Sequence, residues 1–229
     1  MLIAGLQKLT LLDYPGKTAC TLFTPGCNFR CPFCHNASLV TQAVEELIGE
    51  EEFFTFLSRR KGILDGVCIT GGEPTLQKDL IPFIEKIRAM GFLIKLDTNG
   101  YKPDVLGEIL RKGLADYVAM DIKASPGKYA VAAGISDFDF SPIINSIELL
   151  QKSGVNHEFR TTVTGELHSE EDFPEILALF SPDTPYYLQQ FKDSGNLIDE
   201  GCHGWETERM RRLRDELSLR RENIFLREG

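Results

Sequence analysis

The stretch GCNFRCPFCHN, residues 26–36, directly follows an apolar run at Thr18–Thr24. Its three cysteines have the spacing C-x3-C-x2-C, which places three thiolates on one short loop. Iron–sulfur clusters usually take four thiolates, so a cluster held by three leaves one iron free for another ligand. Because an open metal position is where substrate chemistry occurs, we predict catalytic metal ligands at Cys27, Cys31 and Cys34.

Other interpretations of the cysteines must be weighed. Zinc is the main alternative, because three cysteines and a histidine form a common zinc-binding set. His35 follows Cys34 directly, however, and adjacent residues rarely converge on one tetrahedral ion, so ligand type and geometry favour iron and sulfur. A disulfide framework is not expected, because no signal peptide is recognisable. Cys20, Cys68 and Cys202 are isolated, and we expect small buried side chains there.

Length and composition indicate one globular domain. The 229 residues are 42% hydrophobic and 26% charged, which predicts a single domain over residues 1–229. The N-terminus lacks a basic start and a cleavage site, and no apolar run is long enough to span a membrane, so we expect a cytoplasmic protein. A net charge of −9 argues against general affinity for nucleic acid. Arg209–Arg221 also contains acidic residues and apolar residues at helical spacing, and it predicts a solvated C-terminal helix.

Strand-like and helix-like segments alternate along most of the chain. The expected strands are Thr18–Thr24, Gly66–Thr70, Phe92–Asp97, Tyr117–Lys123, His157–Val163 and Tyr186–Phe191. The expected helices between them are Glu50–Lys61, Leu80–Met90, Val105–Lys112, Pro142–Lys152 and Glu170–Phe180. Such alternation predicts an α/β fold of parallel strands joined by right-handed crossovers. A closed eight-stranded barrel usually needs about 250 residues, so six units favour an open, partial (β/α)6 barrel over a doubly wound sheet.

Polar residues follow the expected strands one after another. In parallel α/β folds, ligands collect outside the carboxyl ends of the strands. The groups that we expect at this rim, besides the cysteine loop, are Gly71, Gly72, Glu73, Pro74, Asp97, Asn99, Asp121, Lys123, Arg160 and the stretch Gln189–Lys192. Any one of them is an ordinary turn or strand end, but their recurrence at one end of the fold predicts a binding site.

The chemistry of these groups suits an amino acid joined to a nucleoside. Gly71 and Gly72 allow close approach of the backbone to a ligand. Glu73, held by the following proline, suits an ammonium group, and Lys123 complements a carboxylate. Phe33 provides a face for a flat ring, while Asp97 and Asp121 remain for hydroxyl groups, cations or for holding loops.

The cysteine loop followed by Gly71-Gly72-Glu73-Pro74 resembles the radical S-adenosylmethionine superfamily. That resemblance implies a partial (β/α)6 barrel with a [4Fe–4S] cluster on the three cysteines. It also implies that the fourth iron binds the amino and carboxylate groups of S-adenosylmethionine, which one electron cleaves to give a 5′-deoxyadenosyl radical. The chain lacks the cysteine-rich insert of some members, so one cluster is expected.

Within the superfamily, the chain resembles the activases of glycyl radical enzymes. This resemblance is carried by the cysteine loop, Leu96–Gly100 and Met120–Lys123. The opening segments Gly5–Lys8 and Leu12–Lys17 are similar to those of activating proteins of anaerobic ribonucleoside-triphosphate reductase. The resemblance implies a glycyl radical enzyme as protein substrate and a flavodoxin- or ferredoxin-type electron donor. Pyruvate formate-lyase activases differ around Thr162 and Lys192, which leaves the distal cofactor pocket open. A small-molecule radical enzyme, such as a 7-carboxy-7-deazaguanine synthase, is the alternative.

Overall fold

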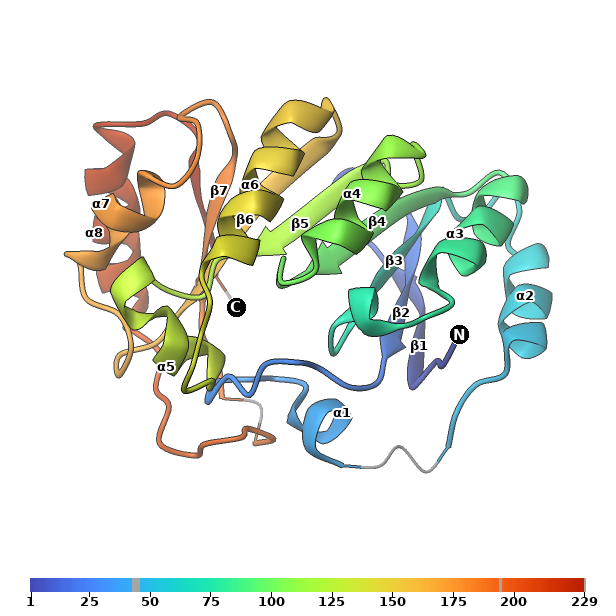
Figure 1. Cartoon of the computed structure of the whole chain (residues 1–229), viewed down its shortest axis with the longest axis horizontal. Helices are drawn as coiled ribbons and strands as arrows, with labels where there is room; N and C mark the ends of the chain where they lie inside the picture. Colours follow the sequence, from blue (N-terminus) through green and yellow to red (C-terminus); the bar gives the residue numbers. More distant parts are fainter. Residues whose placement is uncertain (43–45, 194, 229) are drawn as a thin grey trace.

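A computed structural model describes residues 1–42, 46–193 and 195–228 (Figure 1). One sheet of eight strands follows the order of the sequence, from β1 to β8. The strands are β1 Gly5–Thr10, β2 Ala19–Thr24, β3 Gly66–Gly71, β4 Leu93–Thr98, β5 Tyr117–Asp121, β6 Asn156–Val163, β7 Tyr186–Gln190 and β8 Ile224–Arg227. Within the described residues β1 pairs only with β2 and β8 only with β7, so the sheet does not close into a barrel.

The six strands expected from the sequence are β2 to β7, and all of them run parallel to one another. The open α/β architecture is therefore confirmed. The count of six strands was too low, because an edge strand lies at each side of the sheet. β1 is also antiparallel to β2, so the strands are not all parallel. β8 has only four residues and begins soon after the C-terminal helix that ends at Ser218, so the periodicity of the sequence did not reveal it.

The helices connect successive strands. They are α1 Ala37–Thr41, α2 Glu50–Ser58, α3 Leu80–Ala89, α4 Pro103–Arg111, α5 Tyr129–Ala133, α6 Ser141–Ser153, α7 Asp172–Leu177 and α8 Thr207–Ser218. The sequence indicated six of them, whereas the short helices α1 and α5 were missed. The expected helix Glu170–Phe180 was too long, since α7 forms only its centre. Figure 1 shows α4 packed beside α6, in agreement with their many contacts.

Alternation along the strands separates an apolar face from a polar one. In β4, Ile94 and Leu96 are fully buried on the side that α4 covers with Leu106 and Ile109. Each such side chain contributes roughly 1.5–3 kcal/mol by leaving water. Lys95 and Asp97 lie on the opposite face, because successive strand residues point to opposite sides of a sheet. The helical face thus holds the core, and the opposite face is left for polar side chains.

Among the described residues, no helix is both long and apolar enough to cross a membrane.

Gly154 ends α6 in the left-handed conformation, with φ of 71°. This agrees with the helix end expected there, because glycine adopts positive φ without steric cost.

Candidate active site

The three cysteines of residues 26–36 line one cavity at the carboxyl ends of the central strands. Its volume is about 240 Å³. Of the site residues predicted from the sequence, the cavity is lined by Cys27, Cys31, Phe33, Cys34, Gly71, Gly72, Glu73, Asp97, Asn99, Asp121, Lys123 and Arg160. Pro74 is the exception: it is buried at the start of the short 3-10 helix Pro74–Leu76 and does not line the cavity.

Backbone hydrogen bonds fix the cysteine loop against its neighbours. The N–H of Gly26 donates to the carbonyl of Leu39 in α1 at 2.8 Å. The N–H of Arg30 donates to the carbonyl of Ala133, the last residue of α5, also at 2.8 Å. The two helices that the sequence did not indicate are therefore the ones that hold this loop.

The Gly71-Gly72 pair is required by close packing against the cysteine loop. Gly71 has φ of 113°, a conformation that only glycine adopts readily. A Cβ atom on Gly72 would lie 1.9 Å from the carbonyl oxygen of Gly26, which excludes any side chain there. Asn36, at the end of the cysteine loop, donates from Nδ2 to the carbonyl of Gly71 at 2.8 Å. The two loops thus form one unit.

Glu73 is buried and links the ends of β3 and β4. Its Oε1 atom accepts hydrogen bonds from the N–H and hydroxyl of Thr75 and from the hydroxyl of Thr98. Its Oε2 atom accepts one from the N–H of Asn99 at 2.7 Å. Burial raises the pKa of Glu73, and these hydrogen bonds act in the opposite direction. Oε2 has the N–H of Asn99 as its single partner among the described residues, so it has a lone pair left to accept a hydrogen bond from a ligand.

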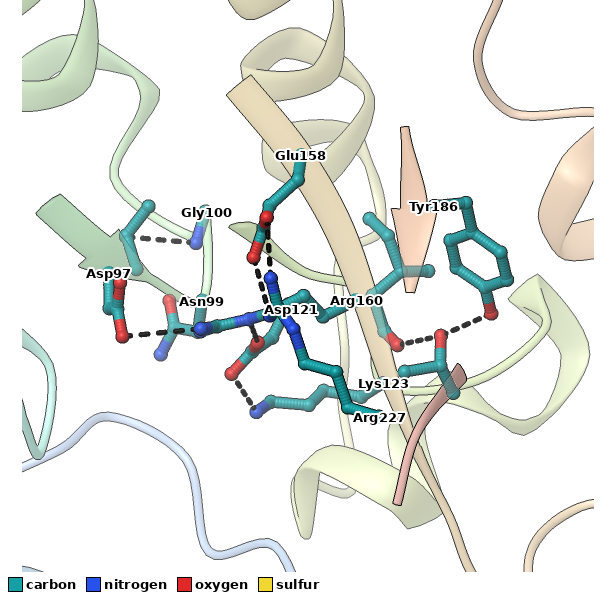
Figure 2. A network of polar contacts seen from close by, with 12 residues as sticks. Asp97, Asn99, Gly100, Asp121, Lys123, Glu158, Arg160, Tyr186 and Arg227 are labelled. Atoms are coloured by element: carbon teal, nitrogen blue, oxygen red, sulfur yellow. Dashed lines mark hydrogen bonds and ion pairs between the residues drawn. The ribbon is translucent and has the colours of Figure 1, made fainter. Parts of the chain in front are cut away.

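A row of alternating charges crosses the polar face of β4, β5 and β6 (Figure 2). Arg160 donates from Nε to Asp121 at 2.8 Å and from Nη1 to Asp97 at 3.3 Å. Asp97 also pairs with Lys95, and Asp121 with Lys123 at 2.9 Å. The small side chain of Ala119, opposite Asp97 in the sheet, leaves room for the guanidinium to reach across β5.

The order of this row is Lys95, Asp97, Arg160, Asp121 and Lys123, so each carboxylate lies between two cations. Burial opposes ionisation of Asp97 and Asp121, but the adjacent cations outweigh it and hold the pKa of both below the usual range. Burial likewise opposes the charge on Lys123, yet Asp121 raises its pKa above the usual value. The row therefore carries one net positive charge, and Lys123 ends it at the cavity beside the cysteines.

The sequence did not single out several other cavity residues, among them Thr70, Thr98 and Val40. Thr162 and Gln189 also line the cavity, whereas Lys192 does not. The Asn99 side chain donates from Nδ2 to Asn28 at 2.8 Å, in the loop itself. The alternation of side chains along β3 could have identified Thr70, which lies on the polar face, whereas Gln189 belongs to the stretch that was expected at the rim and Thr162 had been named at the distal pocket.

The donor set fits an iron–sulfur cluster. Three thiol side chains share the cavity, and the N–H of Phe29 donates to Cys27 Sγ at 3.3 Å. Burial raises the pKa of Cys27 to about 11 and that of Cys31 to about 12, so binding a metal here would release protons. Among the described residues, no three His, Cys, Asp or Glu side chains converge on one ion. A cubane does not require this, since its thiolates bind different irons.

A larger groove, of about 750 Å³, lies between β1 and α2. Leu6, Ile48 and Phe56 line it, together with charged side chains of both signs and no cysteine. The cavity at the cysteines is the smaller of the two, and it is below the roughly 300–1,000 Å³ of pockets that enclose drug-sized ligands. We nevertheless take it as the candidate site, because the thiols and the charged row meet there.

Comparison with known proteins places these residues in context. The family model of the radical SAM superfamily matches residues 21–180. A Methanocaldococcus jannaschii protein named as a glycyl-radical enzyme activating enzyme is 34% identical over 200 residues, which cover 83% of this chain and 80% of the relative. The pyruvate formate-lyase-activating enzyme of Clostridium pasteurianum is 30% identical over 169 residues, with 71% and 70% covered.

Two further similarities are more limited. A 7-carboxy-7-deazaguanine synthase of Hyperthermus butylicus is 38% identical, but over only 79 residues, which are 34% of this chain and 33% of that protein. The crystal structure of Streptococcus suis SuiB bound to precursor peptide SuiA superimposes with a TM-score of 0.70 at 14% identity. It covers 90% of this chain, which spans about half (48%) of the SuiB chain, and it supports the fold alone.

Proposed function

Because this chain belongs to the radical S-adenosylmethionine superfamily, whose members use a [4Fe–4S] cluster and S-adenosylmethionine, we propose that it activates a glycyl radical enzyme. The observation that carries the proposal is the meeting of three thiols, the Gly71–Glu73 loop and Lys123 in one cavity. Two relatives aligned over most of their length are named as activating enzymes of this kind.

In this proposal Cys27, Cys31 and Cys34 hold the cluster. The bound cluster supplies one electron that cleaves S-adenosylmethionine to methionine and a 5′-deoxyadenosyl radical, which takes a hydrogen atom from a glycine Cα of the partner. The chain's own contribution is to position the reactants, since hydrogen abstraction needs the two carbon atoms held close together.

Two groups of the cavity lining suit the two charges of the amino acid moiety. Glu73 Oε2 has one accepting position left for the ammonium group. Lys123 lies at the end of a row with a net positive charge and suits the carboxylate. Phe33 is buried at the cavity wall and provides an apolar surface for a flat ring. Asp97 and Asp121 are occupied by cations, so we assign them to holding Arg160 and Lys123 in place.

The partner that we propose is an anaerobic ribonucleotide reductase, with a flavodoxin- or ferredoxin-type protein as electron donor. The similarity of the opening segments to activators of that reductase supports this choice. The choice does not depend on any cavity residue that would recognise a nucleotide. A pyruvate formate-lyase is the second candidate partner, supported by the relative from Clostridium pasteurianum.

The experiment is a partner-dependence assay with anaerobically reconstituted, reduced protein. We expect slow 5′-deoxyadenosine formation by the protein alone. Addition of the reductase should accelerate it and produce a glycyl radical signal in electron paramagnetic resonance. A partner with Gly→Ala at the radical position is the control and should give no signal.

The same assay tests the small-molecule alternative, which the partial similarity to 7-carboxy-7-deazaguanine synthase motivates. Rapid turnover of a small heterocyclic substrate, with no radical on any candidate partner, would overturn the activase proposal.

A further inference from the structure

His168 is a buried histidine outside the cavity that contacts the backbone of Lys123. It lies in the turn between β6 and α7, and its side chain is almost completely buried. The N–H of Thr164 donates to Nδ1 at 3.1 Å, and Nε2 lies 3.0 Å from the carbonyl oxygen of Lys123. Lys123 is 45 residues away in sequence, two residues after the end of β5.

These two contacts determine the tautomer of the ring. A backbone N–H can only donate, so Nδ1 accepts and carries no proton. The proton of the neutral ring is therefore on Nε2, which donates to the Lys123 carbonyl. Burial lowers the pKa of His168, in agreement with a neutral ring. Both nitrogens are thus used, and the ring is fixed between two backbone groups.

Asp172 makes a second connection between the same two segments. It accepts hydrogen bonds from Ser125 Oγ at 2.8 Å and Lys128 Nζ at 2.6 Å, both in the segment after β5. The N–H of Ser169 donates to it at 2.7 Å from the turn itself. Residues 123–128 are therefore tied to the turn at 164–172 at three points, of which the one through His168 is the nearest to the cavity.

The Lys123 side chain extends from this fixed backbone to Asp121, as Figure 2 shows, and it lines the cavity. We propose that His168 is a positioning residue: its Nε2–H holds the Lys123 backbone so that the ammonium group meets the carboxylate of S-adenosylmethionine. This inference rests on the proposed function, which assigns Lys123 to that carboxylate. The alternative is that His168 only stabilises the turn through Thr164.

Two near-isosteric variants separate these roles. In His168→Gln, the amide N–H can take the place of Nε2–H and keep the bond to Lys123. In His168→Asn, the amide oxygen can take the place of Nδ1 and keep the bond to Thr164, but the side chain is too short to reach Lys123. His203→Asn is the matched control, because that imidazole is 78% exposed in a neighbouring segment.

The measurement is calorimetric titration of S-adenosylmethionine into anaerobically reconstituted protein with an oxidised cluster, with iron content and thermal midpoint recorded for each variant. We expect His168→Gln and His203→Asn to bind within about twofold of wild type. His168→Asn should bind roughly three- to tenfold more weakly, as expected from the loss of one hydrogen bond. In a Lys123→Ala background, His168→Asn should have no further effect.

Each other outcome overturns a specific statement. Weak binding by His168→Gln with normal binding by His168→Asn would assign the histidine to the Thr164 turn. An effect of His168→Asn that persists in full without the Lys123 side chain would exclude action through Lys123. Unchanged affinity in Lys123→Ala alone would refute the assignment of Lys123 under the proposed function, and the positioning role with it.

Discussion

The carbonyl oxygen of Gly26 accepts a hydrogen bond of 2.8 Å from the backbone N–H of Glu73. This bond joins the cysteine loop after β2 to the Gly-Gly-Glu-Pro loop after β3. It brings the three cysteines and the Glu73 carboxylate into a fixed relation although they lie far apart in the sequence. The bond is possible because Gly72 carries no side chain, since a Cβ atom there would collide with the carbonyl group of Gly26.

Gly72→Ala should disrupt this junction. Its Cβ atom would lie 1.9 Å from the Gly26 oxygen, so one of the two loops must move. We expect a loss of about 1–3 kcal/mol in the free energy of unfolding, typical of overpacking, and reduced iron incorporation. Gly127→Ala is the control, because its Cβ atom would meet nothing within 4 Å. Urea denaturation and iron analysis measure both effects, and equal behaviour of the two variants would contradict the prediction.

Replacement of Cys27, Cys31 or Cys34 by Ala should abolish the cluster, because each thiolate would bind a different iron. Cys202→Ala is the control: Cys202 is also buried but does not line the cavity. Iron and sulfide content and the electron paramagnetic resonance spectrum of the reduced protein report the result. An intact cubane signal in Cys31→Ala would be incompatible with this ligand set.

Lys123→Ala should weaken binding of S-adenosylmethionine while the cluster is retained. A charge-assisted hydrogen bond contributes about 1.5–3 kcal/mol, so we expect roughly a ten- to hundredfold loss of affinity. Lys152→Ala is the control, since that lysine is 74% exposed and pairs with Glu148 on the same helix. Glu73→Gln should weaken binding as well, and it should also destabilise the fold, because its amide N–H₂ would face groups that donate to the carboxylate. Titration of each variant gives the affinities.

Arg160→Met should destabilise the protein strongly. The change leaves Asp97 and Asp121 with one cation each, and loss of one partner from a buried ion pair costs about 3–5 kcal/mol. Arg214→Met removes a pair with Asp215 that is largely exposed and should cost less than about 1 kcal/mol. The loss in free energy of unfolding caused by Arg160→Met should be smaller at pH 4 than at pH 7. At the lower pH, protonation removes the charge of the carboxylates that have lost a cation. Urea denaturation at both pH values tests this order.

We expect the contribution of Asp172 to the free energy of unfolding to depend on pH. Burial opposes its ionisation, but hydrogen bonds from Lys128, Ser169 and Ser125 outweigh it and lower its pKa from 3.8 to about 2. Between pH 3.8 and about pH 2, the unfolded chain therefore binds more protons at Asp172 than the folded chain does. The contribution of Asp172 is complete above pH 3.8 and is lost as the pH falls towards 2. Asp172→Asn should cost about 1–2 kcal/mol at pH 7.

The difference in free energy of unfolding between wild type and Asp172→Asn should be the same at pH 7 and pH 5, and it should become smaller below pH 4. Chemical denaturation at several pH values measures it. A difference that grows as the pH falls would show that the hydrogen bonds to Asp172 do not require its charge.

Local patterns predicted much of the fold. The six central strands follow from short apolar runs, and most helices follow from periodicity and from helix ends such as Gly154. Apolar runs and helical periodicity both depend on residues that are close in sequence, so they can be recognised without knowledge of the rest of the chain. β1 and β8 did not follow, because an edge strand is defined by the strand it pairs with rather than by its own composition. The short helices α1 and α5 depend on packing against the cysteine loop.

The sequence by itself predicted the three candidate cluster ligands, since the spacing of Cys27, Cys31 and Cys34 places three thiols on one loop whatever the remaining chain does. It also determined which groups collect at the rim, because the carboxyl ends of parallel strands meet at one edge. Only the tertiary structure decided how these groups are paired. The contacts of Arg160 with Asp97 and Asp121, and of His168 with Lys123, join residues 39 to 63 positions apart. Such contacts depend on strand register and on the turns between strands, and no local pattern encodes them.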